Sequence, residues 1–199
     1  MIRVENLKLP VYYDAEAVKS AVAKKIQIRK SDIREIVILK EALDARKKPH
    51  LYRVVTAGVT LYGDEEPVLN KNKDKCAKET PFAYKPVAVN YQGKHPPLVV
   101  GAGPAGLFGA LTLAKAGLKP VIIESGRQSK ARKEDILSFC DNGDFSSRSN
   151  VQCGEGGAGM FSDGKLTTGT KDVRHREIIK TLIASGAPRE IGYLAKPHS

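Results

Sequence analysis

Three glycines, at positions 101, 103 and 106, stand between two apolar stretches with the spacing Gly-x-Gly-x-x-Gly. Residues 97–100 resemble the end of a buried strand. The apolar residues after the motif recur at helical spacing, at Leu107, Ala110, Leu111 and Ala114. In that context the first glycine permits a tight turn, the second lets backbone approach a pyrophosphate, and the third lets the helix pack near the strand. Because the unpaired N–H groups of the helix start would face the phosphates, the pattern predicts binding of an adenine dinucleotide.

An acidic residue follows at a useful distance. Residues 121–123 have the pattern of a second short buried strand, which ends in Glu124, 18 residues beyond Gly106. A carboxylate at that position accepts hydrogen bonds from the hydroxyls of an adenosine ribose, whereas an NADP site more often has an arginine there. The alternative is an α/β unit whose glycines serve packing only. It would account for Gly106, but not for Gly103 or Glu124.

The most glycine-dense part of the chain lies further on, between Ser149 and Leu166. It holds five glycines, at positions 154, 156, 157, 159 and 164. Such a loop can present backbone N–H groups as an anion-binding nest, so we expect a second phosphate-facing loop. The alternative here is an ordinary surface loop.

The elements around these loops define three segments. Residues 1–65 predict a βαββ module: a strand over 2–9 with a slip in phase between Val4 and Leu7, a helix over 15–25 capped by Asp14, and strands over 33–43 and 51–61 joined by a loop over 44–50. Residues 66–96 are charged and proline-bearing and predict a linker, with a short strand at 87–89. Residues 97–199 predict a partial Rossmann-like domain. The expected fold class is α/β, with a small α+β module (half of a ferredoxin-like fold) before an incomplete Rossmann-like dinucleotide-binding domain.

Composition narrows the choice of partners. The net charge of +11 permits binding of anions, but no aromatic residues interleave with the basic clusters at 46–48 and 71–78, which argues against nucleic acid. No apolar run approaches the length of a membrane span. The three cysteines, at 76, 140 and 153, show neither disulfide nor metal-ligand spacing, which favours a reducing, cytoplasmic setting and no metal. Residues 1–65 show no catalytic spacing, and the catalytic residues of the chain stay unknown.

Three stretches carry a resemblance to a known family. Gly101–Gly106, Ile123–Arg127 and Ser149–Leu166 resemble the bacterial FAD-dependent dehydrogenase-like flavoproteins, also described as NAD- or FAD-utilising dehydrogenases. Residues 44–48 and the closing stretch 186–198 are similar to that family as well. The resemblance implies FAD as the cofactor, with NAD(P)H an open choice for the electron donor of the complete enzyme.

The resemblance also implies roles for individual residues. The FAD pyrophosphate would lie on Gly101, Gly103, Pro104, Ala105 and Gly106. Glu124 would hold the adenosine ribose, and Arg127 would lie beside the adenylate. Residues near the pyrophosphate or the flavin would be Gly156, Gly157, Ala158 and Ser162.

Members of that family are much longer, so we expect this chain to be the N-terminal part of a flavin-dependent oxidoreductase, inactive without its C-terminal domains. An alternative from another class is a non-catalytic dinucleotide-binding protein with a basic interaction module. A plain NAD-binding unit is a third reading, and it would not need the second glycine loop. Substrate, electron acceptor and oligomeric state do not follow from the sequence.

Overall fold

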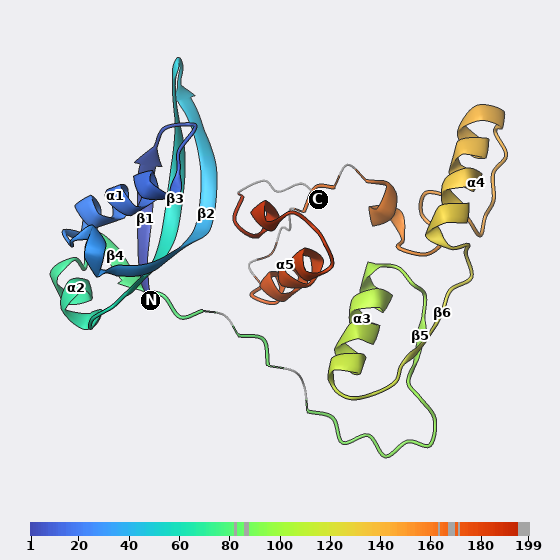
Figure 1. The fold of residues 1–199 in the computed structure, drawn as a ribbon. Coiled ribbons are helices and arrows are strands. Elements are labelled where there is room, and N and C mark those ends of the chain that lie inside the picture. Colours follow the sequence, from blue (N-terminus) through green and yellow to red (C-terminus); the bar gives the residue numbers. More distant parts are fainter. Residues whose placement is uncertain (82, 86–87, 163, 167–169, 171, 195–199) are drawn as a thin grey trace. The chain divides into compact units, whose positions relative to one another are not determined.

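The structure is a computed structural model that describes residues 1–81, 83–85, 88–162, 164–166, 170 and 172–194. It is of mixed α/β type, with one antiparallel and one small parallel sheet (Figure 1). The chain forms two compact units, residues 1–83 with 165–199 and residues 84–164. The sequence grouped residues 165–199 with the glycine loops instead, and the boundaries near residues 65 and 96 stay predictions.

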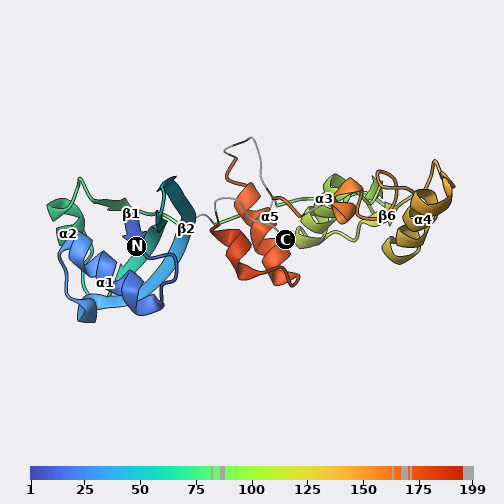
Figure 2. The ribbon, with the colours of Figure 1, turned by 90° about the horizontal axis from the view of Figure 1, so that it is seen from above.

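The first unit contains a four-stranded antiparallel sheet in the order β2-β3-β1-β4. Its elements are β1 (Ile2–Leu9), α1 (Ala15–Ile26), a 3-10 turn η1 (Lys30–Asp32), β2 (Ile33–Lys47), β3 (His50–Leu61), α2 (Glu66–Lys71) and β4 (Cys76–Lys78). This sequence of elements and this strand order are those of the split β-α-β, or ferredoxin-like, arrangement. Both helices contribute to one core on a single face of the sheet (Figure 2).

Neighbouring residues determine where α1 begins and where the pairing of β1 shifts. The Asp14 carboxylate accepts a hydrogen bond from the N–H of Ala17 at 2.8 Å and caps α1, as the sequence predicted. The helix then buries Val18, Val22 and Ile26 against the sheet. The predicted slip in β1 is confirmed, since the pairing with β3 shifts register between Val4 and Leu7.

Parts of the predicted linker over 66–96 and of the predicted loop over 44–50 form regular secondary structure. Residues 66–71 form α2 and residues 76–78 form β4, so the arrangement extends beyond the predicted βαββ half. Elements this short show no clear periodicity within a charged stretch. The strands β2 and β3 continue to Lys47 and from His50, so most of the predicted 44–50 loop is strand. Of the strand predicted at 87–89, Val87 lies outside the described residues, and Ala88 and Val89 belong to no strand.

The second unit follows the predicted order of strand, glycine turn, helix and strand. Strand β5 (Leu98–Val100) pairs in parallel with β6 (Val121–Ile123), and α3 (Pro104–Lys115) connects them. The helix ends at Lys115, and the predicted cap Gly117 lies two residues further on with a φ of +84° that suits glycine. Helix α4 (Ser129–Asn142) and a 3-10 turn η2 (Ala158–Phe161) complete this unit.

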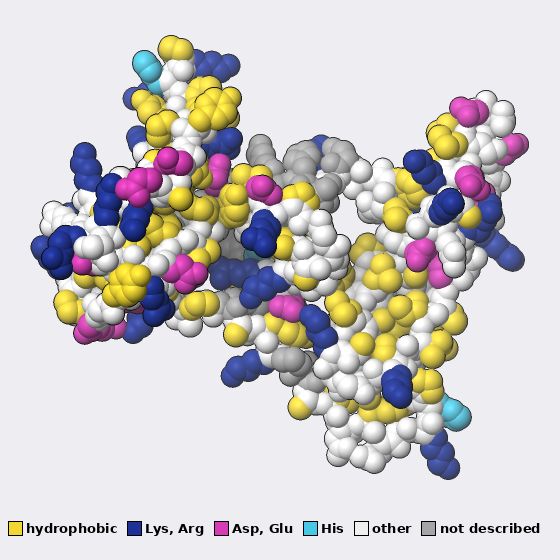
Figure 3. All heavy atoms as spheres, in the orientation of Figure 1, with side chains coloured by type: hydrophobic (Ala, Val, Ile, Leu, Met, Phe, Trp, Pro, Cys, Tyr) yellow, Lys and Arg dark blue, Asp and Glu magenta, His cyan; other side chains and the backbone are white. Residues whose placement is uncertain are grey.

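The expectation that β5 and β6 are buried is wrong in this structure. Val100 is 77% exposed and Ile123 is 48% exposed. Parallel strands are normally covered on both faces by helices, but within the described residues β5 and β6 pair only with each other, and contacts from α3 alone do not enclose them. Hydrophobic side chains therefore gather at the surface over this unit (Figure 3).

Two further elements follow the second unit in the sequence, α5 (His175–Ala184) and a 3-10 turn η3 (Arg189–Gly192). Tyr193 directly follows η3, and its carbonyl accepts a hydrogen bond at 2.8 Å from the N–H of Glu41 on β2. The segment after η3 therefore adjoins the edge strand of the first sheet. Residues 195–198 of the closing stretch lie outside the described residues. Within the described part of the chain, no helix has the length and apolar character needed to cross a membrane.

Candidate functional site

The first glycine loop is a turn that only small residues can make. Gly101 has a φ of +97°, which favours glycine, and its N–H donates to the carbonyl of Ile123 at 2.7 Å. A Cβ on Gly106 would lie 1.9 Å from the carbonyl oxygen of Gly101, so the helix start packs directly on the turn. In contrast, a Cβ on Gly103 would meet nothing within 4 Å. Gly106 therefore serves packing, and Gly103 faces open space at the start of α3.

The start of α3 keeps free donors. Gly103 is the residue before the helix, and no side chain caps it. Pro104 takes the first helical position, where its lack of an N–H costs nothing. The N–H groups of the first turn have no partner inside a helix, and the positive end of the helix dipole lies there. This end of α3 therefore suits an anionic group.

Glu124 braces the same turn. Its carboxylate accepts a hydrogen bond from the N–H of Ala102 at 2.7 Å through one oxygen, and from the N–H of Gly126 at 2.8 Å through the other. These backbone donors, that of Ala102 first, lower the pKa of the Glu124 carboxyl below its ordinary value. Glu124 is therefore ionised at neutral pH. Ser125 adds its N–H and its hydroxyl as weaker donors to the same carboxylate. A ribose hydroxyl would share the carboxylate oxygens with these donors.

The second glycine loop lies against the first one. The N–H of Gly156 donates to the carbonyl of Ala102 at 2.8 Å. Gly157 has a φ of +60°, and a Cβ there would approach the Cδ of Pro104 to 2.9 Å. The sequence predicted both loops as phosphate-facing but did not predict that they touch. The contact joins residues more than fifty positions apart within one unit.

A buried arginine on α4 binds the backbone of the second loop, and the sequence patterns did not predict it. Arg132 on α4 has no exposed surface, and its guanidinium donates to the carbonyls of Asn150, Val151 and Glu155 at 2.6 to 2.8 Å. In the sequence it lies in a charged helical stretch, where an arginine is ordinarily solvated. Only the three-dimensional course of the loop distinguishes it from its neighbours.

The remaining predicted site residues lie at the margin of these loops. The Arg127 guanidinium pairs with the Asp135 carboxylate on α4, while its own carbonyl accepts from the N–H of Glu155 at 3.2 Å. Ala158 begins η2, directly after Gly157. The Ser162 hydroxyl accepts from the N–H of Gly164 at 3.1 Å. None of these three side chains has a described contact with Gly101–Gly106, so their roles toward a cofactor stay predictions.

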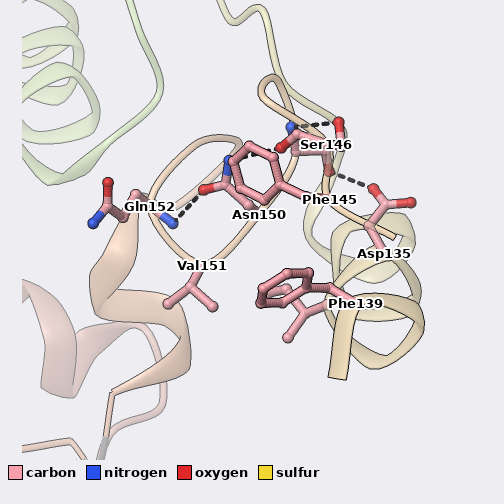
Figure 4. Close-up of a pocket in the computed structure, with 9 residues that line it drawn as sticks. Asp135, Phe139, Phe145, Ser146, Asn150, Val151 and Gln152 are labelled. Carbon is pink, nitrogen blue, oxygen red and sulfur yellow. Dashed lines mark hydrogen bonds between the residues drawn. The ribbon is translucent and has the colours of Figure 1, made fainter. Parts of the chain in front are cut away.

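A small hollow adjoins the loop but contains none of the predicted residues. It has a volume of about 240 Å³ and lies between α4 and residues 145–152. The Phe139 and Phe145 rings contact one another edge to face, with Val151 nearby (Figure 4). Asp135 at its rim binds the Ser149 hydroxyl, so the polar groups there are engaged in holding the loop. We do not assign the hollow a ligand.

The described part of the chain contains few side chains that could bind a metal ion or act as a nucleophile. There, no three histidine, cysteine or acidic side chains gather in a way that would hold a metal ion. Cys140 and Cys153 are exposed free thiols and Cys76 is buried. Burial raises the pKa of the Cys76 thiol, so it is not an activated nucleophile.

Two parts of the chain match known families. Residues 97–132 match a family described as an FAD binding domain, and residues 1–60 match a family described as a domain of unknown function. The first match covers Gly101–Gly106, Glu124, Arg127 and Arg132, and ends before the second glycine loop. It supports a role in FAD binding for this part of the chain, and neither description mentions NAD(P)H.

A protein of Clostridium beijerinckii, named only as an uncharacterized protein, is 40% identical over 200 residues. The similarity covers 99% of this chain but 37% of that protein. The chain thus spans little more than a third of the length of this curated relative.

Proposed function

We propose that residues 97–164 bind the adenylate and pyrophosphate of FAD and belong to a flavin-dependent oxidoreductase. The observation that carries this proposal is the hydrogen bond between Gly156 and Ala102, because it gathers two glycine loops at the start of one helix. A pyrophosphate has several oxygens, and backbone N–H groups from two loops can surround them from more than one side. The family match over residues 97–132 supports FAD as the dinucleotide.

The residues present fit this cofactor at three places. The open space beside Gly103, where a Cβ would meet nothing, leaves room for phosphate oxygens near the first turn of α3. The ionised carboxylate of Glu124 is an acceptor only, so it suits the ribose hydroxyls, which are donors. Pro104 and Ala105 contribute helix-start backbone, and Gly157 and Ala158 border the second loop.

In this proposal the bound flavin supplies hydride transfer, and the protein binds and orients it. The described residues contain no group to which we assign a catalytic step. We attribute the exposed apolar strands β5 and β6 to a larger sheet that other parts of a longer protein complete, as the relative's greater length suggests. We then expect these 199 residues on their own to have no oxidoreductase activity. The three free thiols are consistent with a reducing, cytoplasmic setting, which is part of the same proposal.

Titration with four ligands tests the proposal. FAD and ADP share the adenylate and pyrophosphate that the two loops would hold, whereas FMN lacks the adenylate and NAD lacks the flavin. We expect FAD to bind with quenching of flavin fluorescence, ADP to displace it, and FMN at the same concentration to bind little. NAD carries the same adenylate and pyrophosphate, so tighter binding of NAD than of FAD would instead favour a plain NAD unit. Absence of binding by FAD and by ADP would refute a dinucleotide site.

A further inference from the structure

A buried cation lies beneath the second glycine loop without a carboxylate beside it. Arg132 is 0% exposed, and in the described part of the chain no acidic side chain pairs with it. Its nearest charged neighbour in sequence on α4, Lys133, is exposed. Burying an unpaired charge is costly, so the contacts that Arg132 makes must offset a large desolvation penalty.

The hydrogen bonds of the Arg132 guanidinium that the structure describes all go to backbone carbonyls of one loop. The Nε atom donates to Asn150 at 2.8 Å, one terminal nitrogen donates to Val151 at 2.8 Å, and the other donates to Glu155 at 2.6 Å. Residues 150–157 form no helix or strand, so these carbonyls have no partners from regular secondary structure. The planar guanidinium presents several donors in a fixed fork, and a single ammonium cannot match that geometry.

The loop is shaped to lie on this side chain. A Cβ on Gly154 would come within 2.7 Å of the Arg132 Cδ, and Gly154 has a φ of +120° that only glycine adopts readily. On another side the guanidinium lies 4.8 Å from the centre of the Phe161 ring. The Glu155 carboxylate also accepts from the N–H of Ser129 at 2.7 Å, at the start of α4. The loop is therefore fastened to α4 at both ends of its Asn150–Glu155 stretch.

We propose that Arg132 is a positioning residue: it fixes residues 150–157 in the ligand-free protein so that Gly156 and Gly157 already lie against the first loop when a dinucleotide arrives. The part of this inference that concerns the dinucleotide rests on the proposed function, and the ordering of the free loop does not. Ordering the loop in advance removes an entropy cost from binding, so Arg132 raises affinity without touching the ligand.

Three variants of the full chain test the inference. Arg132→Met keeps much of the side chain's apolar length but removes every donor, and Arg132→Lys keeps the charge without the fork. Lys133→Met is the matched control, because it removes a positive charge from the adjacent exposed position of the same helix. Two measurements are made on each: amide hydrogen exchange at residues 150–157 without ligand, and FAD affinity at a temperature where circular dichroism shows the fold intact.

We expect both Arg132 variants to speed exchange in the loop and to weaken FAD binding by about tenfold or more, with β5, α3 and β6 exchanging as in the wild type. Lys133→Met should match the wild type in both measurements. Wild-type exchange in the Arg132→Met loop would overturn the inference, as would full retention of order and affinity by Arg132→Lys. If the wild type binds no FAD, the proposed function fails, and the exchange measurement still decides whether Arg132 orders the loop.

Discussion

The backbone N–H of Gly156 donates a 2.8 Å hydrogen bond to the carbonyl of Ala102, so two glycine loops far apart in sequence are in direct contact. Glu124 binds the N–H of that same Ala102 at 2.7 Å. One residue of the first loop, Ala102, thus binds the second loop through its carbonyl and an ionised carboxylate through its N–H.

The two glycines of α3 differ in what surrounds them, and their alanine variants should differ accordingly. A Cβ at Gly106 would lie 1.9 Å from the Gly101 carbonyl oxygen, so Gly106→Ala must displace the turn. We expect destabilisation by about 2 kcal/mol or more and loss of measurable FAD binding. Gly109→Ala, with nothing within 4 Å, should stabilise the helix by up to about 1 kcal/mol and keep FAD affinity. Thermal unfolding and FAD titration of both variants check this, and equal behaviour would contradict it.

The second loop offers a similar pair. At Gly157 the φ of +60° and the 2.9 Å approach of a Cβ to Pro104 both oppose a side chain. Gly157→Ala should cost about 1–3 kcal/mol of local strain and weaken FAD binding by about tenfold. Gly159→Ala, which meets nothing within 4 Å, should leave affinity unchanged. Titration of FAD against each variant measures the difference, and unchanged affinity in Gly157→Ala would favour the plain NAD unit.

We expect the contribution of Glu124 to the stability of the fold to decrease as the pH falls. Hydrogen bonds from Ala102 and Gly126 lower the folded pKa below the ordinary value of 4.5. A lowered folded pKa contributes stability that is complete above the unfolded pKa and lost as pH falls through the folded one. Glu124→Gln should therefore be destabilised at neutral pH by about 1–3 kcal/mol, because an amide NH₂ faces a backbone donor.

The gap in stability between wild type and Glu124→Gln should shrink as the solution is acidified below pH 4.5. Denaturant unfolding of both proteins across that range measures it. The control Glu134→Gln changes an exposed carboxylate on α4 and should show no such gap. A gap that is constant with pH, or that widens in acid, would contradict the role given to Glu124.

The helix that the sequence assigned to a linker should contribute to the stability of the first unit. Asn72, 1% exposed, donates to the carbonyls of Ile26 and Val68 at 3.0 Å each, and so connects the ends of α1 and α2. Asn72→Ala should lower the free energy of unfolding by about 1–3 kcal/mol, whereas Asn70→Ala, on the exposed side of α2, should not. Equal stability of the two variants would show that α2 is only loosely attached.

Sequence patterns predicted those parts of the structure in which neighbours in the chain decide the conformation. The Asp14 cap, the slip at Val4 and Leu7 and the turn at Gly101 all depend on residues within a few positions. The exposure of β5 and β6 could not be predicted in this way, because burial depends on elements that do or do not cover a sheet. Arg132 was missed for the same reason: its carbonyl partners lie 18 to 23 positions away in a loop without periodicity.

The most direct test of the central claim is the footprint of FAD in amide hydrogen exchange. If both loops bind one dinucleotide, addition of FAD should slow exchange at residues 101–107 and at residues 154–158 together, at the same FAD concentration. Residues 50–61 of the first unit should exchange as before and serve as the internal control. Protection of the first loop alone, or of neither loop, would contradict the claim that the two form a single site.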